Sequence, residues 1–379
     1  YIICDYEELG YGEFCRRFIE EKPVSVVLFK LKKTSVKFDI KSKESSTYFI
    51  SQMLYSALIS ADKISAANIK IPDIKFADFK TLEKAKINKF KDCSKDKMSI
   101  MRNEIFYSVQ KEIENCFDTN RIFSITAPTG TGKTYCGFFA ALKLRELLKN
   151  KRRIIYALPF TSIINQNYSS ICSLYKDINN FKKESGEYII KHHSLSNVEY
   201  SSEYENYSKT QAEMLIENWN SGIIVTTFVQ LLETLISNKN RMLKKFNALK
   251  GSIILLDEVQ AIDIKLLKLI EYMLYVASRY LDCRIIMMTA TKPLILTDSK
   301  ELLKDSRSYF DSFNRNRIIP IMDPVTIDEF IDEFYSNIED KSYLIICNTI
   351  SQSLKIYNEI KNCGRKVLYL STNILPKYR

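Results

Sequence analysis

Short apolar runs alternate with helix-like segments from about residue 98 to residue 310, and this alternation constrains the fold more than any other feature of the sequence. The candidate strands are RIFSIT from Arg121, RIIYAL from Arg153, GIIVTT from Gly222, SIILLDE from Ser252 and RIIMMT from Arg284. Helix-like segments lie between them, such as residues 133–150 and 264–281. Strands that lack a polar alternation are typical of sheets buried on both faces. The pattern therefore predicts an α/β fold, a mostly parallel sheet covered by helices.

Two segments precede this regular region. Residues 1–71 mix a β-rich stretch at 24–40 with a helix-like stretch at 47–67, and we expect them to form only part of a domain. Residues 72–97 are rich in lysine and weakly apolar, which indicates a solvated connector on the surface.

A second regular region begins near residue 311. It offers a strand at 343–348, a helix at 350–362 and a strand at 366–371. A complete domain of this kind takes about 150 residues, so the sequence predicts one full α/β domain over 98–310 and the start of another over 311–379.

The sequence TAPTGTGKT, residues 126–134, follows a candidate strand and opens a candidate helix. This is the context of a phosphate-binding loop, with an alanine where the first glycine usually stands. Backbone N–H groups of the loop would turn toward phosphate oxygens, Lys133 would contact the β and γ phosphates, and Thr134 would ligate Mg²⁺. The alternative is an ordinary glycine-containing turn between a strand and a helix. The residues assigned to nucleotide binding are Ala127, Pro128, Thr129, Gly130, Thr131, Gly132, Lys133 and Thr134.

Two adjacent carboxylates end the candidate strand SIILLDE. An unpaired charge at the end of a buried strand is costly, so Asp257 is best explained as a partner of Mg²⁺. Glu258 is then the candidate general base for a water molecule that attacks the γ-phosphate. The pair lies 124 residues after Lys133 (257 − 133), and MMTAT follows on the next candidate strand. This order of motifs predicts a site that hydrolyses a nucleotide.

Composition gives weaker indications. The 379 residues are 46% hydrophobic, carry a net charge of +11 and contain nine cysteines without a C-x-x-C pair. The charge favours a polyanionic partner, although lysine is abundant along the whole chain and biased genome composition explains it equally well. No apolar run approaches the roughly 20 residues that cross a bilayer, and no signal peptide is evident. We therefore expect an intracellular, cytoplasmic protein with reduced thiols and no membrane partner.

The motif order resembles that of superfamily 2 helicases, which share a phosphate loop, a D-E-x-x box and an S/T-A-T motif. Further segments make the chain similar to the CRISPR-associated helicase-nuclease of type I interference systems, the Cas-three family. The resemblance covers about residues 100–379. It rests on YALPFTSIINQNY, KHHSLSN, IVTTFVQLLETL, DEVQAID, TATKP, IICNTISQSLKIYNEI and YLSTNILPKYR.

The resemblance implies two RecA-like helicase domains that use ATP and Mg²⁺ to unwind DNA in the 3′ to 5′ direction. It implies single-stranded DNA and a type I RNA-guided surveillance complex as partners. By motif, Thr289 and Thr291 would couple ATP hydrolysis to the strand path, and Gln260 would stand where many members have histidine and donate to a phosphate. The residues expected to face the DNA backbone are Pro159, Thr161, Thr226 and Thr227. For each threonine taken alone, a helix cap or a turn is an equal alternative.

The family also has an HD-type nuclease domain, with histidine and aspartate ligands for two divalent transition metal ions, before the helicase. The helix-like stretch in residues 1–71 resembles the last helix of that domain and makes Asp62 the candidate metal ligand. The only histidines are His192 and His193. We expect them to be solvent-facing or near DNA rather than bound to a metal.

The sequence is expected to be a fragment, because it starts without a methionine and ends before the arginine motif that completes the ATP site. We expect this fragment to bind ATP–Mg²⁺ without coupled unwinding. The alternatives are another superfamily 2 DNA or RNA helicase, and a non-catalytic module that binds nucleic acid or a partner. Whether an inhibitor protein binds the chain stays open.

Overall fold

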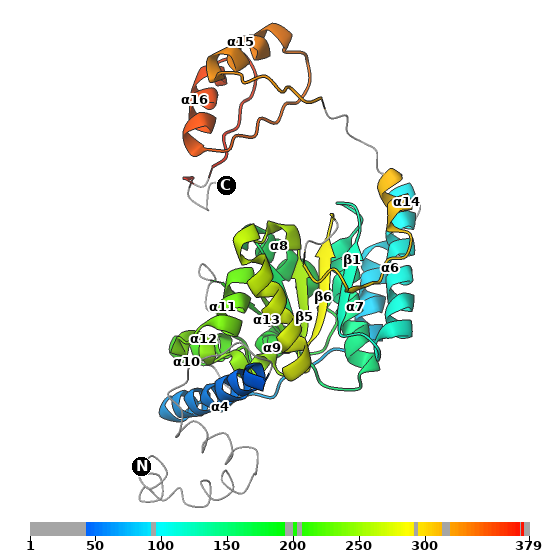
Figure 1. Ribbon diagram of the computed structural model, residues 1–379, viewed down its shortest axis with the longest axis vertical. Coiled ribbons are helices and arrows are strands. Elements are labelled where there is room, and N and C mark those ends of the chain that lie inside the picture. The colour runs from blue at the N-terminus through cyan, green and yellow to red at the C-terminus, as the bar shows by residue number, and fades with distance from the viewer. Residues whose placement is uncertain are drawn as a thin grey trace, which may run out of the picture. The chain divides into compact units, whose positions relative to one another are not determined.

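The computed structural model describes residues 43–91, 96–193, 200–202, 207–291, 295–312, 319–371 and 373–374 (Figure 1). The chain divides into two compact units, Tyr1–Phe313 and Asn314–Arg379. The β-rich stretch at 24–40, the whole of SLSN, the KP of TATKP and the final PKYR lie outside the described residues. Across the part that is described, every helix is too short or too polar to span a membrane.

A seven-stranded sheet forms the centre of the first unit, in the order β3-β4-β2-β5-β6-β1-β7, and all its pairs are parallel. The five predicted strands are confirmed, while the two edge strands, β3 and β7, were not predicted. Edge strands are short or polar, so their sequences lack a long apolar run. The bounds are β1 Ile122–Thr126, β2 Ile154–Leu158, β3 Ile189–His192, β4 Ile223–Thr227, β5 Ile253–Asp257, β6 Arg284–Thr289 and β7 Lys300–Glu301.

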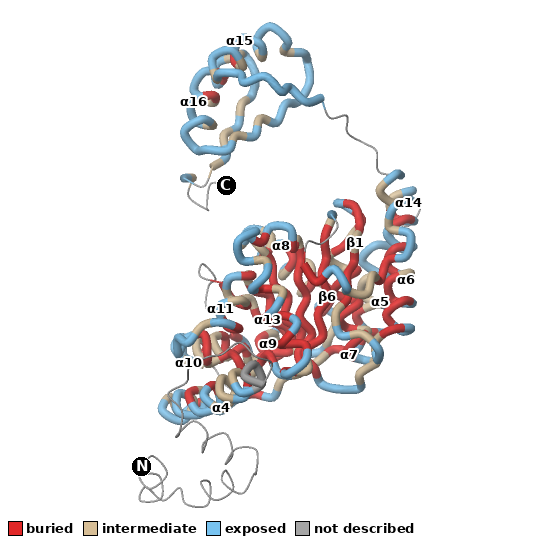
Figure 2. The backbone as a smooth tube through the Cα atoms, in the orientation of Figure 1, coloured by how far each residue is buried: buried red, intermediate tan, exposed pale blue. Residues whose placement is uncertain are grey.

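Helices cover both faces of the sheet, as predicted, and two hydrophobic clusters fill the space beneath them (Figure 2). Along β2, Ile154 and Tyr156 join the first cluster, whereas Ile155 and Ala157 join the second, so both faces of this strand are buried. The first face is covered by α5 Phe79–Lys89, α6 Lys97–Cys116, α7 Lys133–Leu147, α8 Thr161–Cys172 and α9 Phe181–Tyr188. The second is covered by α4 Lys43–Ala66, α10 Lys209–Glu217, α11 Phe228–Ile236, η2 Phe246–Leu249 and α13 Leu267–Tyr280.

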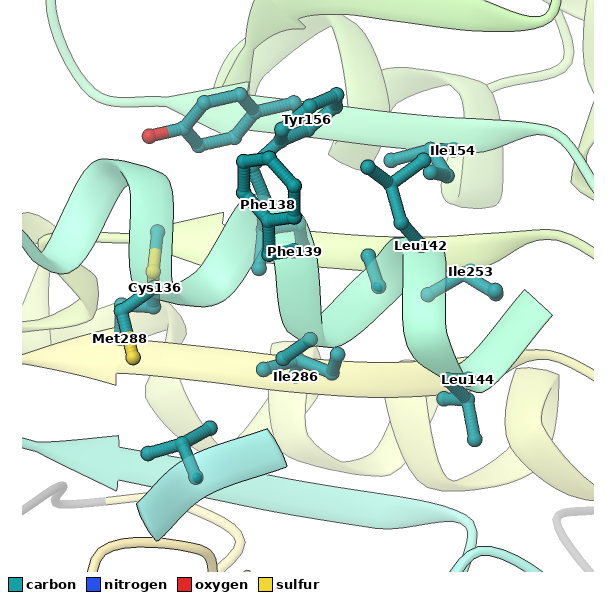
Figure 3. Close-up of a cluster of buried hydrophobic side chains, with 14 of the residues drawn as sticks. Cys136, Phe138, Phe139, Leu142, Leu144, Ile154, Tyr156, Ile253, Ile286 and Met288 are labelled. Carbon is teal, nitrogen blue, oxygen red and sulfur yellow. The ribbon is translucent and has the colours of Figure 1, made fainter. Parts of the chain in front are cut away.

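Helix α7 lies against the middle of the sheet. Its side chain Phe138 points toward Tyr156 on β2, and Leu142 points toward Ile154 on the same strand (Figure 3). This burial explains why residues 133–150 are apolar on more than one side. Shorter elements complete the first unit: α12 Asn240–Leu243, η3 Val259–Ala261, η4 Ile264–Leu266 and α14 Ser306–Asp311.

The described residues 72–91 lie on the surface, as predicted, but one side of them packs against the core, which their composition did not predict. They contain α5, which Asp78 caps by accepting a hydrogen bond from the Thr81 N–H. Phe79 and Leu82 are buried in the first cluster, and the Lys86 ammonium lies 3.4 Å from the centre of the Phe106 ring. Long lysine stems can cover apolar surface while their charge stays near water, so a lysine-rich composition does not exclude a buried face.

Helix α4 belongs to the first unit and packs against α12 and η2. The Tyr48 hydroxyl donates to the Leu235 carbonyl at 2.9 Å, and the Ser60 hydroxyl donates to the Lys244 carbonyl at 2.9 Å. Phe49 is buried in the second cluster. The assignment of this helix to an HD-type domain stays a prediction.

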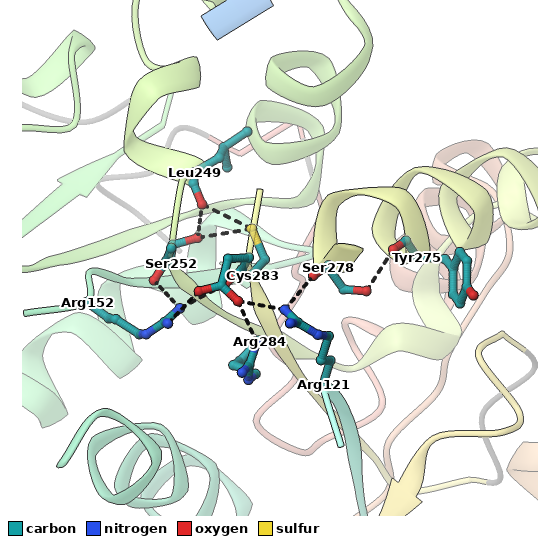
Figure 4. Close-up of polar contacts among 10 residues, drawn as sticks. Arg121, Arg152, Leu249, Ser252, Tyr275, Ser278, Cys283 and Arg284 are labelled. Carbon is teal, nitrogen blue, oxygen red and sulfur yellow. Dashed lines mark hydrogen bonds and ion pairs between the residues drawn. The ribbon is translucent and has the colours of Figure 1, made fainter. Parts of the chain in front are cut away.

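Four charged side chains meet where the strands begin, at the amino edge of the sheet (Figure 4). The Asp282 carboxylate accepts from Arg121 at 2.6 Å, from Arg152 at 2.6 Å and from Arg284 at 3.0 Å. Burial alone would raise the pKa of Asp282, but the hydrogen bonds from Arg152 and Arg121 lower it to about 2. This cluster ties the starts of β1, β2 and β6 together.

In the second unit the predicted helix is confirmed as α16 Ile350–Ile360, and a further helix, α15 Ile327–Asn337, precedes it. The predicted strands at 343–348 and 366–371 are wrong in the described residues, where neither run is a strand. Leu344 is 85% exposed and Ile346 is 83% exposed. A parallel strand needs a neighbour to satisfy its backbone groups, and neither run has a paired strand beside it in the described part of this unit.

Candidate functional site

The predicted nucleotide-binding motifs meet at the carboxyl edge of the sheet. Strands β5, β6 and β1 are adjacent, and Thr126, Asp257 and Thr289 are their last residues. Because all three strands are parallel, their ends face the same edge, where α/β proteins bind ligands. The sheet therefore brings together the loop after β1, the carboxylates after β5 and the threonines after β6.

The loop after β1 has the backbone that a phosphate cradle requires. Gly130 has φ +83° and Gly132 has φ +80°, a left-handed region that favours glycine. The Thr131 hydroxyl donates to the Pro128 carbonyl at 2.8 Å and closes the turn. Gly132 is the N-cap of α7, so the positive end of the helix dipole faces the loop.

The Lys133 ammonium folds back onto this loop. It donates to the Ala127 carbonyl at 3.0 Å and to the Pro128 carbonyl at 3.2 Å. Burial lowers the pKa of Lys133, while the nearby carboxylates of Glu258 and Asp257 oppose that shift. A buried ammonium held only by neutral carbonyls is well placed to take an anionic phosphate as its partner.

Two supporting contacts of the loop were not predicted. Arg102, on α6, donates from two nitrogens to the Gly130 carbonyl, at 3.0 and 2.9 Å. Glu301, on the edge strand β7, accepts from the Thr126 hydroxyl at 2.7 Å and from its N–H at 3.0 Å. No sequence signal marks either residue, because they lie 28 and 175 positions from their partners.

The Asp257 side chain is buried, and one of its oxygens is held while the other is not. Its Oδ2 accepts from the Tyr156 hydroxyl at 2.6 Å, and its buried Oδ1 has no hydrogen-bond partner. Burial raises the pKa of Asp257 to about 6, against the hydrogen bond from Tyr156. A carboxylate oxygen without a partner and a threonine hydroxyl are the kind of oxygen donors that Mg²⁺ accepts, so Asp257 and Thr134 fit the predicted ion.

A hydrogen-bonded chain links the D-E-x-x box to the T-A-T motif. The Gln260 side-chain NH₂ group donates to the Glu258 carboxylate. The Thr289 hydroxyl donates to Gln260 Oε1 at 2.9 Å. The Thr291 N–H donates to that hydroxyl at 3.0 Å. Glu258 has φ +54°, an uncommon backbone for a residue other than glycine that clusters at functional sites. The sheet thus joins the candidate base to the residues predicted to couple hydrolysis to movement.

The four residues predicted to face DNA differ in their surroundings. Pro159 and Thr161 lie at the start of α8 and are partly exposed. The Thr227 hydroxyl accepts from the Gln230 N–H at 3.1 Å and caps α11, which is the alternative that the sequence left open. Thr226 is fully buried, and its hydroxyl donates to the His192 carbonyl at 2.8 Å. A side chain in that position holds β3 against β4 and does not fit a contact with DNA.

Both histidines are buried, so the expectation of a solvent-facing pair is wrong. His192 Nδ1 accepts from the Trp219 indole N–H at 2.9 Å. Burial, together with the nearby cations Lys245 and Arg241, lowers the pKa of His192 to about 3. His192 ends β3 and pairs with Thr226 on β4, and that pairing was not predicted.

Asp62 lies on α4, with its side chain 70% exposed and the Lys63 ammonium 3.9 Å away. Among the residues that the structure describes, no three acidic, histidine or cysteine side chains come together as a metal site. The role of Asp62 as a nuclease ligand stays a prediction.

Comparison with known proteins agrees with the arrangement of these motifs. A family model described as DEAD/DEAH box helicase matches residues 107–298. The CRISPR-associated nuclease/helicase Cas3 of Haloferax volcanii is 32% identical over 213 residues, 54% of this chain and 22% of that protein. The exosome RNA helicase MTR4 of Homo sapiens is 35% identical over 75 residues, 20% of this chain and 7% of that protein.

Among solved structures, T. fusca Cas3 with AMPPNP is similar at a TM-score of 0.44 and 19% identity, over 81% of this chain and 32% of that one. The chain thus spans about a fifth of its Haloferax relative and about a third of this structure.

Proposed function

Since the chain belongs to the DEAD/DEAH box helicase family, we propose that its first unit binds ATP–Mg²⁺ and that the whole protein hydrolyses this nucleotide to drive movement on nucleic acid. The observation that carries this proposal is the convergence of Lys133, Asp257 and Glu258 at one edge of the sheet. Lys133 lies close enough to the two carboxylates for their charges to affect its pKa. These groups are among those that phosphoryl transfer to water requires.

Each residue has a defined task in this proposal. The N–H groups of the loop and Lys133 hold the β and γ phosphates, and Thr134 and Asp257 hold the metal ion. A Mg²⁺ ion held by Thr134 and Asp257 would supply positive charge to balance the charge that develops on the phosphate oxygens. Glu258 accepts a proton from the attacking water, and Gln260 fixes the Glu258 carboxylate by its hydrogen bond. Thr289 and Thr291 respond to hydrolysis through Gln260.

For the whole protein we propose a role in CRISPR interference, unwinding target DNA in the 3′ to 5′ direction for degradation by a linked nuclease. The similarity to the Haloferax nuclease/helicase over 54% of this chain supports it. A type I RNA-guided surveillance complex would deliver the single-stranded DNA, and Pro159 and Thr161 at the start of α8 would contact its backbone. The nuclease and its metal ions, with Asp62 as a candidate ligand, belong to this proposal.

Removal of the Lys133 ammonium tests the nucleotide site. Lys133→Ala should abolish ATP binding, measured by calorimetry, because no other ammonium is held by the loop in the described residues. Lys111→Ala, an exposed lysine on α6, is the matched control and should bind ATP as the parent does. ATP binding by Lys133→Ala equal to that of the control would show that the site is wrongly assigned.

A second candidate function is RNA remodelling, favoured by the similarity to the RNA helicase MTR4. The two candidate functions differ in which nucleic acid should stimulate ATP hydrolysis. ATP hydrolysis by the whole protein that rises with single-stranded DNA and not with RNA supports the first proposal, and the reverse supports the second.

A further inference from the structure

The hydroxyl of Tyr156 lies where three functional elements meet. Tyr156 is on β2 and is fully buried. Its hydroxyl donates to Asp257 Oδ2 at 2.6 Å and accepts from the Asn167 amide at 2.9 Å. Thr134, from the phosphate loop, lies close enough to affect the pKa of Tyr156. One hydroxyl therefore contacts Asp257 and helix α8 and lies near the second proposed metal ligand.

The donor pattern orients this hydroxyl. A tyrosine hydroxyl has one proton, and the Asn167 NH₂ group can only donate, so it must use an oxygen lone pair of Tyr156. The proton of Tyr156 is then directed to Asp257 Oδ2. Because the Asp257 carboxylate is fixed in this way, its other oxygen, Oδ1, stays without a partner and available to a metal ion.

Asn167 connects this site to the outer surface of α8. The Asn167 side chain is buried on the inner side of the helix, six residues after Thr161 (167 − 161). The opposite side carries exposed Ser162, Asn165 and Gln166, and Phe160, directly before the helix, is 57% exposed. A regular helix moves as a stiff body, so a shift at its first turn is transmitted to Asn167.

We propose that Asn167 and Tyr156 couple nucleic acid bound at the start of α8 to the position of Asp257. Tyr156 is a positioning residue, since it acts through Asp257 and not on the phosphates. The inference rests on the proposed function, because it needs an Asp257 that holds Mg²⁺ and a nucleic acid that contacts α8. A tyrosine with a purely structural role would affect stability and leave the dependence on Mg²⁺ and nucleic acid unchanged.

Tyr156→Phe tests the coupling, because it removes one oxygen and keeps the ring in place. In the whole protein we expect the Mg²⁺ concentration for half-maximal ATP hydrolysis to rise about tenfold, the scale of one hydrogen bond to a charged group. The stimulation of kcat by single-stranded DNA should fall by a similar factor, while the affinity for metal-free ATP changes less than about twofold. Asn167→Leu should also reduce the stimulation of kcat by single-stranded DNA. Without the Asn167 amide donor, the Tyr156 proton is no longer directed toward Asp257.

Tyr175→Phe is the matched control. Tyr175 is as deeply buried as Tyr156, and its ring lies 5.2 Å from that of Phe181 on α9. It should keep the parent's dependence on Mg²⁺ and DNA, and its thermal midpoint measures the general cost of losing a buried hydroxyl.

Two outcomes contradict different statements. In the first outcome, DNA or RNA stimulates ATP hydrolysis by the parent, and it stimulates Tyr156→Phe equally. If both proteins also need the same Mg²⁺ concentration for half-maximal hydrolysis, the coupling is overturned and the proposed function stays intact. A parent whose ATP hydrolysis ignores both nucleic acids would overturn the proposed function and the coupling together.

Discussion

Lowering the pH should destabilise the first unit through His192, and the molecule carries its own probe for this effect. The chain has one tryptophan, Trp219, which is fully buried and donates its indole N–H to His192 Nδ1. A protonated His192 cannot accept that hydrogen bond. The fluorescence of Trp219 therefore reports on the group that titrates.

The magnitude follows from the two pKa values. The pKa of His192 is about 3 in the folded protein, because burial disfavours the charged ring, against 6.5 for an exposed histidine. The unfolded state therefore binds the proton first as pH falls, and stability is lost from about pH 6.5 down to about pH 3. At about 1.4 kcal/mol for each pH unit, the loss at pH 5 relative to pH 7 is about 2 kcal/mol.

The assay is denaturant unfolding at pH 7, 6 and 5, followed by tryptophan fluorescence. His192→Asn keeps an acceptor near the indole and removes the titrating ring, so it is the matched variant. Asp257 works in the opposite direction, since burial raises its pKa to about 6, but its effect is present in both proteins and cancels in the difference. Equal losses of stability in the parent and in His192→Asn between pH 7 and pH 5 would refute a neutral, buried His192.

Two further predictions concern stability. Asp282→Asn should lower the free energy of unfolding by about 1–3 kcal/mol, because it removes the charge shared by Arg121, Arg152 and Arg284. The pKa of Asp282 is depressed to about 2. In denaturant titrations, the stability difference between the parent and Asp282→Asn should therefore be full above about pH 4 and shrink as pH falls toward 2. A stability difference that does not depend on pH would contradict the pairing. Thr227→Ala should cost about 0.5–2 kcal/mol through loss of the α11 cap, while Thr227→Ser keeps it. If both variants bind single-stranded DNA like the parent in an anisotropy titration, the cap is the whole role of Thr227.

Local pattern was enough to predict the central strands and the phosphate loop. The five central strands are apolar because they are buried on both faces: β1, β2, β4, β5 and β6. Each such strand therefore shows as an apolar run of consecutive residues in the sequence. The glycines at 130 and 132 and the lysine that follows are also adjacent in sequence, so their geometry depends on a single turn. The convergence of the loop with Asp257 follows from parallel strands ending at one edge.

The tertiary structure decided what the local pattern does not encode. Strand order places Tyr156 beside Asp257, 101 positions away, and brings Glu301 to Thr126, 175 positions away. Pairing of β3 with β4 buries His192, which was expected to face solvent or lie near DNA, and Thr226, which was expected to face DNA. Composition suggested a solvated segment at 72–97, but packing against α7 buries one side of α5. Burial depends on which elements become neighbours, and only the assembled sheet and its helices determine that.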